Sequence, residues 1–345
     1  MSSDLDALRQ TLAKNATRYD RAGAWPTESL IALEQAGAWK WVIPSRYGGL
    51  EREAISHLEG YEAIAAGCMS TLLILANRDG ACELIAACDN EPLKSELLPA
   101  LAENSVMATV GISQLTTSHQ SGPPALTASP ADGGFVLDGF MPWVTSAEKC
   151  QYLVTGAILP DGNQLLVAAP TSAPGMQIEP PMELMAMQGT LTSLVRCRQV
   201  FVEKRVVLRG PAPRVLATKS GVKPSLVAAS GVGLASAMLE IMGRCATGSW
   251  TRTLERWTSR HSELRRTVFG FAASPDAKTN DAEKTRIRIL VNDLLARLAA
   301  AVLTFSKGSG LLRDQDAQRL VREAMFFQVW AAPEDVRAGT VAMLL

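Results

Sequence analysis

Few side chains of this chain are spaced for metal or thiol chemistry. The three histidines, His57, His119 and His261, lie far apart in the sequence, so they offer no zinc-type ligand spacing. The six cysteines include no CxxC pair and stand mostly among apolar neighbours, as reduced thiols of a cytosolic protein do. We therefore expect reduced cysteines and no metal site.

The bulk composition indicates a soluble globular protein. With 345 residues, of which 47% are hydrophobic and 20% charged, the chain is large enough for two or three packed units. Its 34 basic and 34 acidic side chains cancel, which argues against nucleic acid or an anionic membrane as partner. The first ten residues are polar and acidic, and no apolar run reaches the roughly 18 residues of a membrane span. We expect a cytoplasmic location.

The predicted secondary structure, which must position any site, changes twice along the chain, from helical to β and back to helical. Up to residue 107 the spacing of apolar residues is helical, with helices predicted over 53–66, 71–87 and 92–102, and with Gly37 as the stop signal of an earlier helix. From 108 to 209, short segments rich in valine, threonine and aromatics are separated by Gly-Pro and Asp-Gly turns, as in a β meander or small barrel.

The predicted strands of this middle region cover 135–139, 152–158, 164–169 and 194–202, the last with alternating apolar and charged residues. The Pro-rich segment Gly210–Pro213 is expected to end the sheet. Beyond it the helical period returns. Ile287, Val291, Leu294, Leu298 and Ala301 form one stripe, and Leu320, Ala324 and Phe327 form another.

The order helical, β, helical argues against a doubly wound sheet, a TIM barrel and a β sandwich. We predict an α+β multidomain chain with an N-terminal all-α domain over 1–107, a β-barrel-like domain over 108–209 and a C-terminal four-helix bundle over 210–345.

Several motifs resemble the acyl-CoA dehydrogenase family, over about residues 20 to 335. Pro44–Leu50 is similar to the family's P-x-x-Y-G-G loop, which alone is a weak signal because paired glycines simply mark a turn. More specific is Leu137–Ser146, which resembles the strand I-N-G-x-K-x-W-I-T-N. The resemblance implies that the Trp143 indole packs beside a flavin ring and that the Thr145 hydroxyl lies near the reactive flavin nitrogen. The alternative to these flavin contacts is an ordinary β hairpin in which Trp143 is only a packing residue.

An earlier segment, Val110–Gln114, stands where the family has a strand leading into T-E-P-x-A-G-S-D. By resemblance, the main chain of Ile112 and the Ser113 hydroxyl grip the flavin pyrimidine. The following residues, 115–120, replace the proline and the small-residue loop, and their bulk would crowd the approach of a phosphate to the backbone. His119 takes the place of the loop serine, either as a ligand contact or as a surface-loop histidine.

Two further segments extend the resemblance. Met185–Ser193 is similar to M-G-x-R-x-S-x-T, although the arginine of that loop is absent. Ala228–Ala235 resembles A-A-x-x-x-G-x-A on the first bundle helix, where small residues allow close packing.

The carboxylate base of the family is not found. Such a base works best in an apolar pocket that raises its pKa. The chain stops at Leu345, so the segment that would carry it in one version is missing, and Lys223 stands near the alternative place. Lys223 is either a buried base or simply a lysine near a helix start. Arg252 and Arg266 match the family's pyrophosphate arginine only by rough spacing.

Three hypotheses follow from the resemblance. The first is a divergent FAD-dependent dehydrogenase that removes hydrogens from the α and β carbons of an acyl thioester or related small molecule, as a homodimer or homotetramer. The second is a flavin monooxygenase of the same fold, which needs no α-proton base. The third is a non-catalytic binding or assembly protein. The sequence leaves the substrate and the catalytic residues unassigned.

Overall fold

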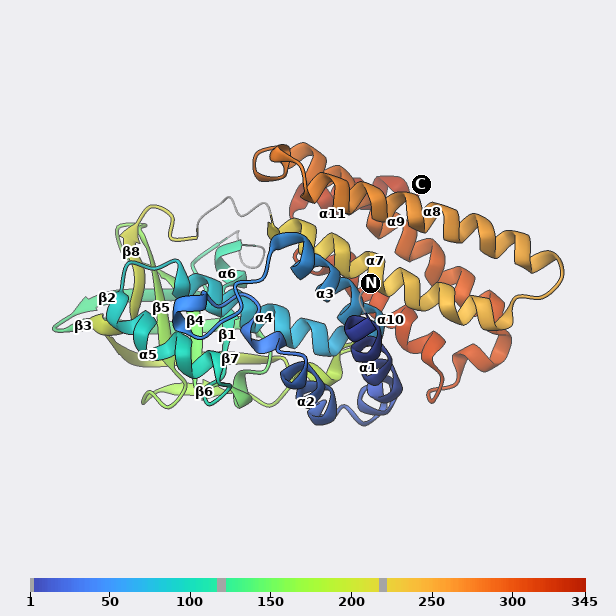
Figure 1. Cartoon of the computed structure of the whole chain (residues 1–345). Coiled ribbons are helices and arrows are strands. Elements are labelled where there is room, and N and C mark those ends of the chain that lie inside the picture. Colours follow the sequence, from blue (N-terminus) through green and yellow to red (C-terminus); the bar gives the residue numbers. More distant parts are fainter. Residues whose placement is uncertain (1–2, 117–121, 217–221) are drawn as a thin grey trace.

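A computed structural model of the chain describes residues 3–116, 122–216 and 222–345. A helical block, a sheet and a second helical block follow one another in sequence, which confirms the predicted fold class. Figure 1 shows the sheet at one end of the molecule and the long C-terminal helices at the other, with α3 and α4 between them. The site residues predicted on the sheet therefore belong to the part of the molecule next to the N-terminal helices.

The N-terminal block packs its helices through apolar faces. Leu5, Leu8 and Leu12 recur at helical spacing and are buried, so the first helix lies against the rest of the domain. Gly37 has a φ of +69°, a conformation that glycine adopts without strain, and it ends the helical run as predicted. The helices are α1 (Ser3–Ala22), α2 (Thr27–Gln35), α3 (Ala54–Gly67), α4 (Met69–Ala86) and α5 (Glu91–Ala102).

The middle block is a sheet of eight strands in the order β6-β7-β3-β2-β4-β5-β8, with β1 paired to β4. Most pairs are antiparallel, but β4 runs parallel to both β1 and β2. The strands are β1 (Ala108–Gly111), β2 (Leu126–Ala131), β3 (Gly134–Val144), β4 (Tyr152–Ile158), β5 (Gln164–Pro170), β6 (Met176–Ile178), β7 (Ser193–Glu203) and β8 (Val207–Ala212). Four of them match the predicted strands to within a few residues, except that β3 is much longer.

Two sequence-based expectations for this block are wrong. The Pro-rich segment does not end the sheet, because Gly210 and Pro211 lie within β8, which pairs with β5. Proline is tolerated there since β8 is an edge strand with one neighbour. The strand expected to continue through Gln114 ends at Gly111, and a short helix, α6 (Ser113–Thr116), follows it. The side-chain amide of Gln114 holds that turn by donating to the carbonyl oxygens of Gly111 and Gly156.

The C-terminal block contains the predicted bundle. Its helices are α7 (Val222–Cys245), α8 (Ser249–Ala272), α9 (Asp281–Ser306), α10 (Asp316–Val329) and α11 (Glu334–Met343). The predicted stripe on α9 is buried at Ile287, Val291, Leu294 and Leu298. Arg288 and Asp293 are buried as well, although the pattern placed them off the stripe. Both have polar partners, since Arg288 donates to the carbonyl oxygen of Phe327 and Asp293 pairs with Arg297.

Small residues on α7 allow close packing, as the sequence indicated. A Cβ at Gly233 would lie 2.1 Å from the carbonyl oxygen of Glu62 on α3, and a Cβ at Gly231 would meet Val291 at 2.3 Å. α7 therefore packs closely against both the N-terminal helix α3 and the bundle helix α9.

Two helical stretches of the described chain, Pro224–Cys245 and Asp281–Leu311, are long and apolar enough to cross a membrane by length and composition. Of their apolar windows, 67% and 56% are buried against other parts of the chain. Core helices of a bundle meet the same test, and packing accounts for the apolar character here.

Candidate functional site

The end of β3 presents an indole outward and a hydroxyl inward. Trp143 is 52% exposed, whereas Thr145 is 5% exposed. Side chains two residues apart on a regular strand point the same way, but the register of β3 against β7 shifts between Met141 and Val144, where the strand ends. This irregularity allows the two side chains to face different surroundings.

The Thr145 hydroxyl belongs to a row of buried hydroxyls. Its oxygen lies 3.4 Å from Oγ1 of Thr192, which lies 2.8 Å from Oγ1 of Thr190. The Thr190 hydroxyl donates over 2.7 Å to the carbonyl oxygen of Met187. Ser146 joins the same loop, since its backbone N–H and its hydroxyl both donate to the carbonyl oxygen of Thr190.

The backbone that holds this row is bent in an unusual way. Ser146, Met187 and Leu191 all have positive φ, at 60°, 66° and 49°. Non-glycine residues pay about 1 to 2 kcal/mol for this conformation, and such residues concentrate at ligand sites. Three such residues occur in the two loops that carry Ser146 and Thr190. These loops therefore keep their conformation although it lowers the stability of the fold.

Ser113 and Ile112 approach the same region from β1. A Cβ at Gly111 would touch the side chains of Met141 and Val144, so the end of β1 lies directly against the end of β3. The Ser113 hydroxyl oxygen is buried and has no hydrogen-bond partner among the residues that the structure describes. The Ile112 side chain packs into the apolar cluster that includes α4 and α5, and its carbonyl oxygen accepts the N–H of Leu115 over 2.9 Å.

Four other residues were singled out from the sequence. His119 lies outside the described residues, and Lys223 belongs to the first turn of α7. Arg252 and Arg266 are exposed on α8. Cys150, which follows the site in sequence, is buried, and burial raises the pKa of its thiol to about 12, so it is not a nucleophile.

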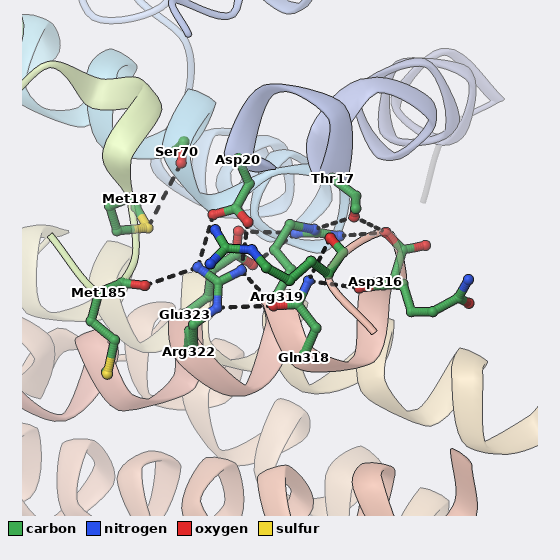
Figure 2. Close-up of polar contacts among 12 residues, drawn as sticks. Thr17, Asp20, Ser70, Met185, Met187, Asp316, Gln318, Arg319, Arg322 and Glu323 are labelled. Carbon is green, nitrogen blue, oxygen red and sulfur yellow. Dashed lines mark hydrogen bonds and ion pairs between the residues drawn. The ribbon is translucent and has the colours of Figure 1, made fainter. Parts of the chain in front are cut away.

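The loop that carries Thr190 and Thr192 is clamped by α1 and α10. Arg322 on α10 donates from Nη1 to the carbonyl oxygen of Met185 and to Asp20 of α1, over 2.9 and 3.1 Å (Figure 2). Gln188, which replaces the arginine of the family motif, ties the loop to itself by accepting from the N–H of Leu184 and donating to the carbonyl of Met182. The guanidinium that contacts this loop thus comes from a distant helix.

Sequence reasoning missed this clamp and the ion pair beside it. Arg319 and Glu323 on α10 are almost completely buried and lie 2.9 Å apart, next to Asp316 and Thr17 (Figure 2). The spacing of charges along α10 at i, i+3 and i+4 was the available signal. It did not suffice, because the same spacing is common on solvated helix faces.

A cleft of about 220 Å³ opens beside α6, between the loop before β2 and the ends of β4 and β5. Neither Trp143 nor Thr145 lines it. The residues around it include Gln114, Leu115, Pro124, Leu126, Ile158 and Gln164. The exposed face of the Trp143 indole therefore lies on the open surface and does not belong to this cleft.

The residues present fit the ring end of a flavin. An exposed indole offers a face for a planar ring, and the neighbouring strand ends of β3 and β1 are followed by two buried hydroxyls, those of Thr145 and Ser113. An unpartnered buried hydroxyl costs free energy, which a ligand hydrogen bond would recover.

Comparison with known proteins relates this chain to the acyl-CoA dehydrogenases. Residues 5–105 match the family described as Acyl-CoA dehydrogenase, N-terminal domain. A probable acyl-CoA dehydrogenase of Bacillus subtilis, YngJ, is 21% identical over 99% of this chain and 95% of its own length.

Solved structures share the fold at low identity. Glutaryl-coenzyme A dehydrogenase in complex with glutaryl-CoA superposes with a TM-score of 0.83 at 18% identity, over 99% of this chain and 95% of that one. TdsC of Paenibacillus sp. A11-2, a dibenzothiophene monooxygenase, superposes in its complex with FMN and indole with a TM-score of 0.85 at 14% identity, over 99% and 94%. Both a dehydrogenase and a monooxygenase therefore have this architecture.

Proposed function

Since this chain is a divergent member of the acyl-CoA dehydrogenase family, we propose that it is a flavin-dependent oxidoreductase that dehydrogenates the α and β carbons of an acyl thioester or related substrate, with FAD as cofactor. The observation that carries the proposal is the end of β3, which carries the exposed Trp143 indole and the buried Thr145 hydroxyl and packs against Gly111 at the end of β1. Two residues after Gly111, the Ser113 hydroxyl is buried and has no partner in the described chain.

A bound flavin would supply the hydride acceptor for the β carbon. The chain's own part is to bind and orient it. Trp143 would cover one face of the ring, Ser113 would hydrogen-bond its pyrimidine end, and Thr145 would contact the reactive nitrogen edge. The clamped loop behind Thr145 fixes that hydroxyl in place.

Removal of the α proton needs a base, and the described residues limit the candidates. Their buried carboxylates are each paired with a cation, and a nearby cation favours the charged form of a carboxylate, which makes it a weaker base. At Glu323 burial outweighs the pairing and raises the pKa, but both oxygens are held by Arg319. The pairs are Asp20–Arg322, Glu62–Arg265, Asp79–Arg78, Asp293–Arg297 and Glu323–Arg319. By this argument a dehydrogenase takes its base from a carboxylate that is not buried or from Lys223.

This pairing gives weight to a second candidate function. A flavin monooxygenase of the same fold activates oxygen at the flavin and needs no α-proton base, and TdsC shows that the fold accommodates one. Both candidates use the same flavin contacts at the end of β3. They differ in where the reducing equivalents come from.

We further propose that the protein is cytoplasmic and forms a homodimer or homotetramer. Several large apolar side chains are exposed near the C-terminus of the single chain, among them Val329, Val341 and Leu344. Such a group favours contact with another subunit. Sedimentation of the purified protein would test this, and a monomer over the working concentration range would contradict it.

The function is tested by anaerobic reduction. Holoprotein reconstituted with FAD is mixed with a series of acyl-CoA esters, and the visible flavin absorbance is followed. Bleaching by an acyl-CoA without a separate reductase supports the dehydrogenase. No bleaching, together with oxygen-dependent turnover of supplied reduced flavin, supports the monooxygenase. A protein that binds no flavin contradicts both.

A further inference from the structure

The outer face of α8 carries a row of exposed arginines. Three of the 24 residues of this helix are buried, all in its second half, so the first half presents most of its side chains to solvent. Arg252, Arg256 and Arg260 follow one another at four-residue spacing and are exposed, which places them in one line, about 6 Å apart along the helix. We call these three residues the arginine row. Figure 1 shows the start of α8 at the end of the molecule opposite the sheet.

The charge of the arginine row is only partly neutralised. The side chains of Arg252 and Arg256 form no ion pair or hydrogen bond with any residue that the structure describes. Arg260 binds the Asp293 carboxylate over 2.5 Å, but Arg297 of α9 binds the same carboxylate over 2.6 Å, and the side chain of Asp293 is completely buried. Four guanidinium groups therefore share one carboxylate at this surface.

Acidic residues nearby do not cancel this charge. α8 contains five arginines and two glutamates, whereas the formal net charge of the whole chain is zero, so the positive excess is local. Glu255 is exposed beside the row, and Glu263, which accepts the Ser259 hydroxyl, lies past its end. A positive strip on a chain with no net charge attracts a partner only at short range, through a matching set of anionic groups.

The spacing of the arginine row matches that of carboxylates on a second helix. Acidic side chains four residues apart on a helix also lie about 6 Å apart, so each guanidinium can meet one of them. A guanidinium binds a carboxylate through two parallel hydrogen bonds, which a lysine cannot form. We propose that this face of α8 docks an acidic helix of a partner protein, with carboxylates at four-residue spacing. This docking is independent of the proposed flavin chemistry.

Three other occupants suit the row less well. Nucleic-acid sites that neutralise about 6 to 10 phosphates need a longer footprint, whereas the row extends over about 12 Å and holds three arginines. A membrane-bound helix inserts apolar side chains beside its cations, but Leu254 and Trp257 of α8 are partly buried and pack against the apolar core. A two-fold contact between copies of this chain would set two rows of like charge against each other.

The test uses a synthetic alanine-based helical peptide with a glutamate at every fourth residue, labelled with a fluorophore whose anisotropy reports binding to the full chain. A second peptide has the same composition but consecutive glutamates. The proteins compared are the wild type, the double variant Arg252→Gln/Arg256→Gln and the control double variant Arg198→Gln/Arg313→Gln. The control also removes two exposed arginines, so the loss of charge is equal. Neither change removes a side-chain contact of the described chain, so both variants should fold.

At about 0.15 M ionic strength the wild type and the control should bind the spaced peptide equally. Arg252→Gln/Arg256→Gln should bind it about 10-fold more weakly, since each exposed ion pair contributes up to about fivefold. The peptide with consecutive glutamates should bind the wild type more weakly than the spaced one.

The proposal is overturned if the wild type does not bind the spaced peptide, if the two double variants bind it equally, or if the two peptides bind equally well. It is also overturned if duplex DNA or phosphatidylserine vesicles bind more tightly than the spaced peptide. A change of sedimentation in Arg252→Gln/Arg256→Gln alone would instead assign this face to a second copy of the chain.

Discussion

Arg322 on α10 donates a 2.9 Å hydrogen bond to the carbonyl oxygen of Met185, 137 positions earlier in the chain. The same guanidinium pairs with Asp20, whose side chain is 5% exposed. Replacing Arg322 by Gln leaves a buried carboxylate without its cation, so we expect a loss of about 3 kcal/mol in the free energy of unfolding. Amides of residues 182–192 should also exchange faster with solvent in the variant.

Arg18→Gln is the control for that change. Arg18 pairs with Glu28, but both side chains are more than half exposed, so the loss should be much smaller than in Arg322→Gln. Equal losses in the two variants, measured by denaturant unfolding, or unchanged exchange of residues 182–192 in Arg322→Gln, would show that the clamp does not hold the loop.

Ser113→Ala separates ligand binding from stability. The hydroxyl oxygen is buried without a partner in the described chain, so its removal breaks no internal bond and relieves the cost of an unpartnered polar group. The flavin-free protein should therefore become more stable, by about 1 kcal/mol. Flavin binding should weaken by about 1 kcal/mol, which is roughly 5-fold in the dissociation constant. Calorimetric titration beside the surface variant Ser129→Ala checks this. Equal flavin affinities of Ser113→Ala and Ser129→Ala would show that the Ser113 hydroxyl does not contact the flavin.

Gly233→Ala tests the contact between α7 and α3. Its Cβ would lie 2.1 Å from the carbonyl oxygen of Glu62, so the helices must separate, at a cost of about 3 kcal/mol. Gly270 on α8 has nothing within 4 Å of an added Cβ, and Gly270→Ala should stabilise the protein by about 1 kcal/mol. Thermal unfolding of both variants gives the sign of each effect. The same sign for both would contradict the packing.

Buried thiols predict a loss of stability in alkali. Burial raises the pKa of Cys82 to about 11 and the pKa values of Cys150 and Cys197 to about 12, above an ordinary value of 9.0. From pH 9 up to the folded pKa, about 11 for Cys82 and about 12 for Cys150 and Cys197, these thiols ionise in the unfolded chain but stay protonated in the fold. Each then lowers the free energy of unfolding by about 1.4 kcal/mol per pH unit.

Urea unfolding at several pH values, with Cys150→Ala for comparison, measures this loss, which should be smaller in the variant. Below pH 9 the contribution should be constant. In the native protein a thiol reagent at neutral pH should modify the exposed Cys245 first, because the other five cysteines are buried. A slope in alkali that is identical in Cys150→Ala would show that this thiol does not contribute.

Local patterns predicted the order of the blocks, since the apolar spacing of α9 and α10 and the alternation in β7 reflect burial directly. Trp143 and Thr145 could be singled out because they stand in one short motif. That they face different surroundings could not be foreseen, because it depends on a register shift against β7.

Contacts between distant segments could not be predicted from the sequence. The Asp20–Arg322 pair joins residues 302 apart, and nothing in either segment specifies the other. The hydroxyl row likewise joins Thr145 to Thr192 through a loop whose positive φ values fall on Met187 and Leu191, residue types that give no turn signal.

The proposed site at the end of β3 is tested most directly by titrating FAD into protein purified without added flavin, with the Trp143→Ala and Trp250→Ala variants in parallel. Trp250 also exposes its indole, but on α8. We predict one flavin bound per chain, with affinity about 10-fold weaker in Trp143→Ala and unchanged in Trp250→Ala. Absence of binding, or equal affinity in the two variants, would contradict a flavin resting on Trp143.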